Sequence, residues 1–405
     1  MPTTMASTPR ASRTVRDTGL LWAASGISVI GDGAYAAAAP LLATTLTTDP
    51  LAISAVTAAT FAPWLLVGPL AGAWVDRLPR RRVMVVADLI RAIVLAVLAT
   101  GVLAGTINVA IVAACAFLIT AGQTFHSAAA QAIIPQLIGR DPVALARLNG
   151  RIFATETAVG GFVGPPAGSA LFAINAWAPF VVDAVSFGAS ALLLRGISDP
   201  PAPERNGAKV AASIREGMVW LLRRRDLVSL AALVSISNLA SNIAFGAFVL
   251  YVVQGLHVPL PWYGLLLAAQ AVGAVIGGWS APRLAKRLSP RYSMLGAYIL
   301  KAAAFLGIAL VPSVLLVSVA LVIVGAASTL ATVAVISARQ TLVPDHLLGR
   351  VVTAFRVVGN GTAPVGALIG GVIAAASSLS APLLVAAAVQ AAAVVLAALW
   401  PDKPD

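Results

Sequence analysis

The chain has 405 residues, of which 59% are hydrophobic and only 10% are charged. A typical soluble domain carries about 25% charged residues, so this composition excludes a water-soluble protein and requires lipid as the solvent for most of the surface. The formal net charge of +12 would suit a nucleic-acid-binding protein, so the placement of the basic residues decides what that charge means.

Long apolar runs recur along the chain and predict twelve transmembrane helices. One helix needs about 20 apolar residues to cross roughly 30 Å of hydrocarbon. In chain order, the predicted spans are 18–42, 51–75, 83–104, 108–133, 152–173, 178–194, 227–254, 262–282, 292–312, 314–336, 351–376 and 381–400. These runs are continuous, whereas the strands of a membrane barrel alternate in polarity over about ten residues. The predicted fold class is therefore all-α and integral to the membrane.

The basic residues fall on one side of the predicted spans. With the amino terminus inside, Lys and Arg collect in the cytoplasmic loops, while the opposite turns contain neither; these turns lie near 43–50, 105–107, 174–177, 255–261, 311–313 and 377–380. This asymmetry follows the positive-inside rule and predicts that both termini are cytoplasmic. It accounts for the net charge, so we expect no nucleic-acid partner. The strong preference for Ala and Arg favours a bacterial plasma (inner) membrane.

The longest polar interruption runs from Ser198 to Asp226 and divides the spans into six and six. The predicted domains are a cytoplasmic tail at 1–17, an N-terminal six-helix bundle at 18–195, a cytoplasmic linker at 196–226, a C-terminal six-helix bundle at 227–400 and a cytoplasmic tail at 401–405.

The two halves share an internal repeat. Gly68–Met84 and Gly278–Met294 match at six of seventeen positions without a gap, and each stretch joins the second and third span of its half. A duplicated six-helix bundle explains this match. Transporters with such repeats bind their substrate near the membrane midplane, between the two halves.

Asp32 lies near the middle of the first span, between Gly31 and Gly33. A carboxylate at the bilayer centre is costly, so such residues normally face a cavity and serve a function. Ser28, Asp32 and Tyr35 follow one another at three- and four-residue steps and form a polar stripe on one helix face. We expect Asp32 to bind a proton or the substrate. The alternative is a structural acid that caps the backbone or pairs with a buried cation.

Polar residues also recur on later spans. His126 in the fourth span and Glu156 in the fifth are further candidates for proton binding. The candidates for a substrate cavity on the fourth, seventh and tenth spans are Gln123, Thr124, Ser127, Gln131, Asn238, Ser241, Asn242, Thr329 and Thr332. For any single member, a hydrogen bond between helices is the alternative. Asp88 and Arg91 lie three residues apart and are expected to neutralise each other. Lys301 in the ninth span has no partner that the sequence identifies.

The loop between the second and third spans carries the most specific motif, which reads GAWVDRLPRRR over residues 72–82. It resembles the signature loop of the major facilitator superfamily (MFS), with Pro79 where the family usually has Gly. Within the superfamily, the chain resembles the branch of macrolide, siderophore and secondary-metabolite exporters. The resemblance implies a gating loop whose residues are Gly72, Asp76, Arg77, Arg80 and Arg81. In the family, the acid that matches Asp76 contacts the amino-terminal end of the eleventh helix, where the helix dipole favours an anion.

A second motif in the fifth span reads GFVGPPAG over residues 161–168, followed by Ser169. It is similar to the antiporter motif of this branch, whose last Gly is replaced here by Ser169. The resemblance implies a flexible and leak-tight helix contact at Gly161, Gly164, Pro165 and Gly168. Small residues at this spacing also permit close packing alone. The resemblance further implies two pseudo-symmetric bundles in which the first, fourth, seventh and tenth spans line a central cavity. The fourth span lacks the Arg that many proton-coupled drug exporters carry there.

Together these observations predict a secondary-active exporter that works by alternating access. We expect proton-coupled antiport of an amphipathic small molecule such as a drug, siderophore or secondary metabolite. The alternatives are a lipid or lysophospholipid flippase on the same fold and a membrane sensor that transports nothing. The sequence has no GxxxxGK[ST] phosphate-binding loop, and its three histidines (His126, His257 and His346) are scattered, so we expect no enzyme, no cofactor and no metal site. The expected partners are the small-molecule substrate, protons and the lipid bilayer, and the expected state is a monomer.

Overall fold

The structure is a computed structural model that describes residues 9–75, 77–139, 141–198 and 210–399. These residues are almost entirely helical and contain no β-strand. The N-terminal half consists of α1 (Pro9–Leu46), α2 (Pro50–Leu66), α3 (Gly68–Val75), α4 (Arg80–Leu103), α5 (Val109–Ile138), α6 (Pro142–Thr155), η1 (Glu156–Val163), α7 (Gly164–Ile174) and α8 (Ala178–Arg195). The C-terminal half consists of α9 (Val210–Arg223), α10 (Arg225–Phe245), α11 (Phe248–Leu250), η2 (Tyr251–Gly255), α12 (Leu260–Ala285), α13 (Pro290–Leu310), α14 (Val314–Leu342), α15 (Asp345–Ala376) and α16 (Ala381–Leu399).

The described helices account for all twelve predicted spans. Ten segments are long and apolar enough to cross a membrane, and two shorter apolar helices, Pro50–Leu66 and Ala381–Val395, complete the set. Three spans are built from more than one element, namely α2 with α3, α6 with η1 and α7, and α10 with α11 and η2. The predicted all-α membrane fold is confirmed.

Short polar caps set where several helices begin. Asp49 accepts a hydrogen bond from the backbone N–H of Leu51 at 2.9 Å, and Asn108 accepts one from Ile111 at 3.0 Å. Asp141 caps the start of α6 in the same way, with bonds to two backbone N–H groups. These side chains satisfy donors that the first turn of a helix leaves unpaired, so they fix the turns between successive spans.

The fifth span changes its winding in the middle. Glu156–Val163 forms a π-helix, η1, directly before Gly164, Pro165 and Pro166. Proline has no N–H to donate to the preceding turn, and its ring crowds the carbonyl group four residues earlier, so a regular α-helix is disfavoured here. Single π-turns inside helices are common at functional sites.

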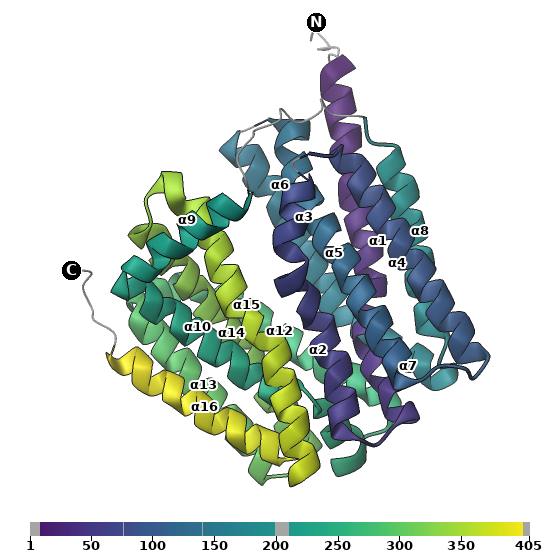
Figure 1. Cartoon of the computed structure of the whole chain (residues 1–405), viewed down its shortest axis with the longest axis vertical. Coiled ribbons are helices and arrows are strands. Elements are labelled where there is room, and N and C mark those ends of the chain that lie inside the picture. Colours follow the sequence, from purple (N-terminus) through teal and green to yellow (C-terminus); the bar gives the residue numbers. More distant parts are fainter. Residues whose placement is uncertain (1–8, 76, 140, 199–209, 400–405) are drawn as a thin grey trace, which may run out of the picture.

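The two halves of the chain form two helix bundles, coloured purple to teal and teal to yellow in Figure 1. The bundles meet at the end away from the labelled N terminus and diverge toward the other end (Figure 1). At the closed end, α2 packs against α15 and α7 packs against α12. Thr57 on α2 also donates a hydrogen bond of 3.1 Å to the carbonyl oxygen of Gly246, just after α10. The bundles are therefore joined at one end of the molecule.

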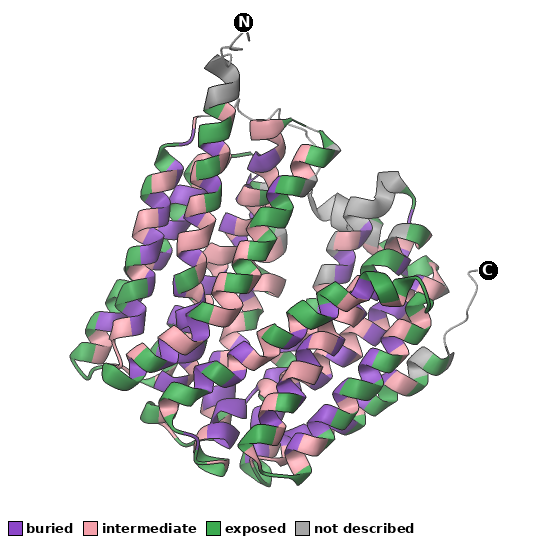
Figure 2. Ribbon diagram, turned by 180° about the vertical axis from the view of Figure 1, so that it is seen from behind, coloured by how far each residue is buried: buried purple, intermediate pink, exposed green. Residues whose placement is uncertain are grey.

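Large apolar side chains cover the outside of both bundles. Figure 2 shows buried residues along the inner faces of the helices and exposed residues around them. The exposed residues include Leu103, Ile174, Leu192, Trp279 and Leu315. An apolar surface of this extent is stable in a bilayer, where lipid chains replace water as the solvent.

Candidate functional site

The described part of the N-terminal bundle contains a buried charge network built around Arg91. Arg91 on α4 reaches across to Asp32 on α1, and its Nη2 atom lies 2.5 Å from Asp32 Oδ1. The side chain of Arg91 is only 2% exposed, whereas that of Asp32 is 30% exposed. Asp32 is thus the partly accessible end of an ion pair whose cation lies inside the bundle.

Asp88 joins the same network from the other side. Its Oδ1 atom lies 3.8 Å from Arg91 Nη1 and 2.7 Å from Nδ1 of His126 on α5. Ser190 on α8 donates a hydrogen bond of 2.6 Å to Asp88 Oδ2. Arg91 therefore pairs more closely with Asp32 than with Asp88. The physical reason is that the guanidinium group extends from α4 across the interface with α1 to Asp32. The spacing of Asp88 and Arg91 along one helix does not reveal this contact between helices.

Gly122 and Phe187 accommodate the side chain of Arg91 in the position that reaches Asp32. A Cβ atom at Gly122 on α5 would lie 2.7 Å from Arg91 Cγ, so only glycine fits there without displacement. The ring of Phe187 on α8 lies under the guanidinium group, with Arg91 Cζ 3.6 Å from its centroid. This is a cation–π contact, which stabilises a charge that has left water.

Asp183 on α8 adds a third acid. It is fully buried and lies against Gly31, where a Cβ atom would collide with its carboxylate. Ser186 donates a hydrogen bond of 3.2 Å to Asp183 Oδ1. The Asp183 Oδ2 atom and the Tyr35 hydroxyl are both buried without a hydrogen-bond partner. In the sequence, this polar face is indicated by the spacing of Asp183, Ser186 and Ser190, because steps of three and four residues place them on one side of α8.

The network contains more acids than bases. Asp32 and Asp88 pair with one guanidinium group, and Asp183 is buried beside Gly31, the chain neighbour of Asp32, so the formal charge of these groups is negative even when His126 is counted as protonated. A buried charge without compensation is costly, and proton uptake by a carboxylate or by the histidine reduces that cost. Asp32 is the member of this network that is partly accessible.

The other candidates in the N-terminal bundle lie outside this network. Glu156 is exposed at the start of η1, and Gln131 is exposed on α5. Ser28 is buried and donates to the carbonyl oxygen of Ser25 in its own helix. The remaining candidates on α5 are bonded within that helix: Gln123 lies 3.5 Å from Ser127 between side chains, and Thr124 donates to the Ala121 carbonyl oxygen.

In the C-terminal bundle, the polar residues of α10 are bonded inside the bundle. Asn238 donates to the carbonyl oxygen of Gly359 on α15 at 2.9 Å, and Asn242 donates to the carbonyl oxygen of Asn238. Ser241 accepts a hydrogen bond from Lys301 at 2.8 Å. On α14, Thr329 is partly buried and Thr332 is exposed. A cavity lined by these residues stays a prediction.

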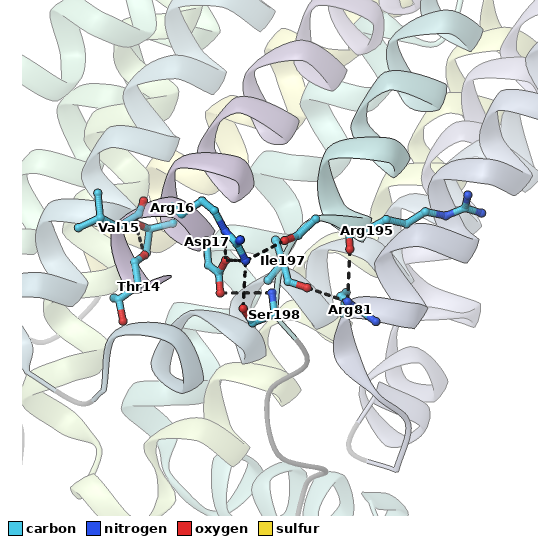
Figure 3. Close-up of polar contacts among 10 residues, drawn as sticks. Thr14, Val15, Arg16, Asp17, Arg81, Arg195, Ile197 and Ser198 are labelled. Atoms are coloured by element: carbon cyan, nitrogen blue, oxygen red, sulfur yellow. Dashed lines mark hydrogen bonds and ion pairs between the residues drawn. The ribbon is translucent and has the colours of Figure 1, made fainter. Parts of the chain in front are cut away.

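Two arginines of the loop motif, Arg80 and Arg81, form hydrogen bonds within the N-terminal bundle. Arg81 donates to the carbonyl oxygens of Arg195 and Ile197 at the end of α8 (Figure 3), and Arg80 donates to that of Ala132 on α5. A cation is favourable at the end of a helix, where the carbonyl groups are unpaired. Gly72 has open space around it and Arg77 is exposed; Asp76, the acid with the implied gating role, lies outside the described residues.

The N-terminal part of α1 also forms hydrogen bonds with the residues at the end of α8. Arg16 donates to the carbonyl oxygen of Gly196 and to the hydroxyl of Ser198, and Asp17 accepts the backbone N–H of Ser198 at 3.2 Å (Figure 3). The ends of α1, α4 and α8 that lie near the N terminus therefore form one bonded unit.

The antiporter-type motif makes close contacts in two directions. Gly164 packs against Gly33 and Gly168 packs against Ala34 of α1, so neither glycine leaves space for a side chain. Gly161 faces Ala271 on α12 of the other bundle. A Cβ atom added at Gly161 would lie 2.7 Å from the Cβ atom of Ala271. The motif thus packs α7 tightly on α1 and brings the fifth span against the C-terminal bundle.

Ser169, one residue beyond the motif, forms hydrogen bonds between the two bundles. Its hydroxyl donates to the carbonyl oxygen of Pro261 at 2.8 Å and accepts the backbone N–H of Gly264 at 3.2 Å. Both partners lie in the first turns of α12.

Replacement of Gly168 by Ala is expected to lower the amount of folded protein and its melting temperature in detergent. The added Cβ atom would lie 2.5 Å from Ala34 Cα, a backbone atom that cannot move away alone. Overpacking of this kind typically costs about 1–3 kcal/mol. The matched control is Gly188→Ala on α8, where no atom lies within 4 Å of the new Cβ. Equal melting temperatures for the two variants would contradict the packing described here.

Comparison with known proteins identifies the family. The family described as "Transmembrane secretion effector" (MFS_3) matches residues 8–401. The chain belongs to this family. This MFS transporter is 30% identical to the multidrug efflux pump Tap of Mycolicibacterium fortuitum over 370 residues, which cover 87% of each chain. It is 28% identical to the multidrug efflux pump Tap of Mycobacterium tuberculosis (strain ATCC 25618 / H37Rv) over 373 residues, covering 89% of this chain and 88% of the relative.

Solved structures confirm the fold of the MFS transporter. The nucleoside transporter NupG superposes with a TM-score of 0.78 at 12% identity, over 95% of this chain and 99% of the other. A bacterial homologue of the iron transporter ferroportin, in an inward-facing state, superposes with a TM-score of 0.74 at 18% identity, over 96% and 99%. At these identities the likeness shows the twelve-helix MFS fold alone. With the family and the efflux-pump relatives, the protein is a multi-pass membrane transporter of the efflux type.

Proposed function

We propose that this efflux transporter exports an amphipathic small molecule in exchange for protons, and that the network around Arg91 is its proton-binding site. The observation that carries the proposal is the pairing of Asp32 and Asp88 with one buried guanidinium group, with a third acid, Asp183, buried beside Gly31. The relatives are multidrug efflux pumps, which supports a drug-like substrate.

The geometry suggests how protons act on the helices. Protonation of Asp32 removes the negative charge that faces Arg91, so the guanidinium group then interacts mainly with Asp88. Because Asp32 belongs to α1 and Arg91 to α4, the change weakens a contact between two spans. A proton bound more tightly in one conformation than in the other shifts the equilibrium between them, which is the requirement for coupling.

The membrane orientation follows from the positive-inside pattern. We place both termini in the cytoplasm of a bacterium, so the end at which the bundles diverge faces the cytoplasm (Figure 1). The closed end, where α7 meets α12, then faces outward. Substrate enters between the bundles from the cytoplasm and leaves after the closed end has opened. We propose Asp76 and the loop arginines as the gate at the cytoplasmic end.

The experiment is transport into inside-out vesicles with an imposed pH gradient. We expect uptake of ethidium when the lumen is acidic and loss of that uptake when an ionophore collapses the gradient, because the exit of protons from the lumen drives the entry of ethidium. Vesicles without the protein are the control, and a fluorescent lysophospholipid in the same vesicles tests flippase activity. Uptake that follows a sodium gradient, or that needs no ion gradient, would contradict the proposal.

A further inference from the structure

The internal repeat places a second buried cation opposite Arg91. When the match between Gly68–Met84 and Gly278–Met294 is continued without a gap, Arg91 on α4 corresponds to Lys301 on α13. Both residues lie in the third span of their bundle, and both are buried; Lys301 is only 4% exposed.

The structure supports this alignment independently. Arg81 and Arg291 are matched residues of the repeat, and each donates to a carbonyl oxygen at the end of the sixth span of its own bundle. Arg81 donates to Arg195 on α8, and Arg291 donates to Ala398 on α16. Arg195 and Ala398 lie equally far from the Ala-Pro pair with which each helix begins. These equivalent hydrogen bonds support the register that pairs Arg91 with Lys301.

The two cations contact equivalent helices. Arg91 binds Asp32 on the first span, and Lys301 donates hydrogen bonds to Ser237 and Ser241 on the seventh span, at 2.9 Å and 2.8 Å. Ser237 in turn donates to Oε1 of Gln390 on the twelfth span, at 3.2 Å. Lys301 therefore occupies the position in the C-terminal bundle that Arg91 occupies in the N-terminal bundle.

The two cations differ in what compensates their charge. Arg91 has two carboxylates within 4 Å, whereas the described neighbours of Lys301 are two hydroxyl groups and no acid. The charged or titratable residues on α13 itself and on α10, α12, α14 and α16 are Arg225, Asp226, Tyr263, Arg283, Arg291, Tyr292, Tyr298 and Arg339. Most lie near helix ends. Asp226 is paired with Arg224, and Tyr298 lies one turn before Lys301.

A buried charge with only neutral partners is costly, and proteins avoid that cost by releasing the proton or by binding an anion. We propose that Lys301 releases and rebinds a proton during the transport cycle, so that each bundle has its own proton-exchanging group. The proposal rests on the proton-coupled antiport proposed above. On release, one N–H bond of the ammonium group breaks, the electron pair stays on Nζ, and the proton passes to water by way of the Ser241 hydroxyl, which is partly exposed.

The test counts protons exchanged per ethidium in proteoliposomes containing the full-length protein, from the pH gradient at which net ethidium flux reverses. We expect Lys301→Gln and Lys301→Arg each to lower the count by one proton, because glutamine has no proton to exchange and arginine does not release one. The matched control is Lys286→Gln at an exposed position after α12, with an unchanged count.

An unchanged count in both folded Lys301 variants, alongside a lowered count in Asp32→Asn, would overturn this inference and leave the proposed function intact. A wild-type count of zero would overturn the proposed function and this inference with it. A chloride requirement that Lys301→Gln removes would show that Lys301 binds an anion, which also overturns it. If neither variant folds, NMR of wild-type protein with isotope-labelled lysine decides. One of its four lysine signals must then respond to pH separately from the other three.

Discussion

Replacement of Asp32 by Asn is expected to abolish ethidium uptake driven by a pH gradient while the protein stays folded. Asparagine keeps the shape of the side chain and a hydrogen-bonding oxygen for Arg91, but it cannot exchange a proton. Arg91 retains Asp88 as a counter-ion at 3.8 Å, so no cation is left without compensation. We expect uptake to fall at least about 10-fold, which corresponds to roughly 1.4 kcal/mol or more of lost coupling.

The matched control for this prediction is Asp49→Asn. Asp49 is exposed and caps α2, and asparagine is as good a cap as aspartate, so transport and folding are expected to be unchanged. The measurement is gradient-driven uptake in inside-out vesicles, normalised to the amount of folded protein. Full gradient-driven uptake by Asp32→Asn would remove Asp32 from the mechanism.

Replacement of Arg91 by Gln is expected to destabilise the N-terminal bundle as well as to stop transport. The change leaves Asp32 and the fully buried Asp88 without the cation that they share. Removal of one partner from a buried ion pair typically costs about 3–5 kcal/mol, because the remaining charge is uncompensated. The melting temperature of the purified protein in detergent measures this loss.

A double variant separates charge from shape. In Arg91→Gln with Asp32→Asn, both members of the closest pair are neutral, so we expect part of the lost melting temperature to return while transport stays absent. Arg82→Gln, the same change at an exposed position on α4, is the control and is expected to melt as the wild type does. A melting temperature of Arg91→Gln equal to that of Arg82→Gln would contradict the buried network.

The sequence was sufficient for the architecture because the membrane imposes simple rules. Continuous apolar runs and the placement of Lys and Arg predicted all twelve spans, and the repeat between Gly68–Met84 and Gly278–Met294 predicted two related bundles. The rule that an acid at membrane depth is functional also singled out Asp32. These predictions depend on local composition, which a single sequence displays directly.

The partners of the charged residues could not be predicted in the same way. Arg91 was paired with Asp88 because the two are neighbours on one helix, whereas the fold brings Asp32 from another span closer to it. Asp183 lies only one turn into its helix, so its burial against Gly31 depends on how α8 packs on α1. The sequence identifies no partner for Lys301, because its partners are serines, which are common in membrane helices and carry no distinctive signal.

The serine that follows the antiporter-type motif has a consequence for the speed of the cycle. A glycine at position 169 has no hydroxyl, so it cannot bridge α7 and α12 as Ser169 does. Parting the bundles at this end exposes the Pro261 carbonyl and the Gly264 amide, which water must then reach. Polar contacts between membrane helices average about 0.6 kcal/mol, so two of them prolong the closed period by a several-fold factor. Ser169 is therefore expected to slow the separation of α7 from α12, so the lifetime of the closed end depends partly on one hydroxyl group.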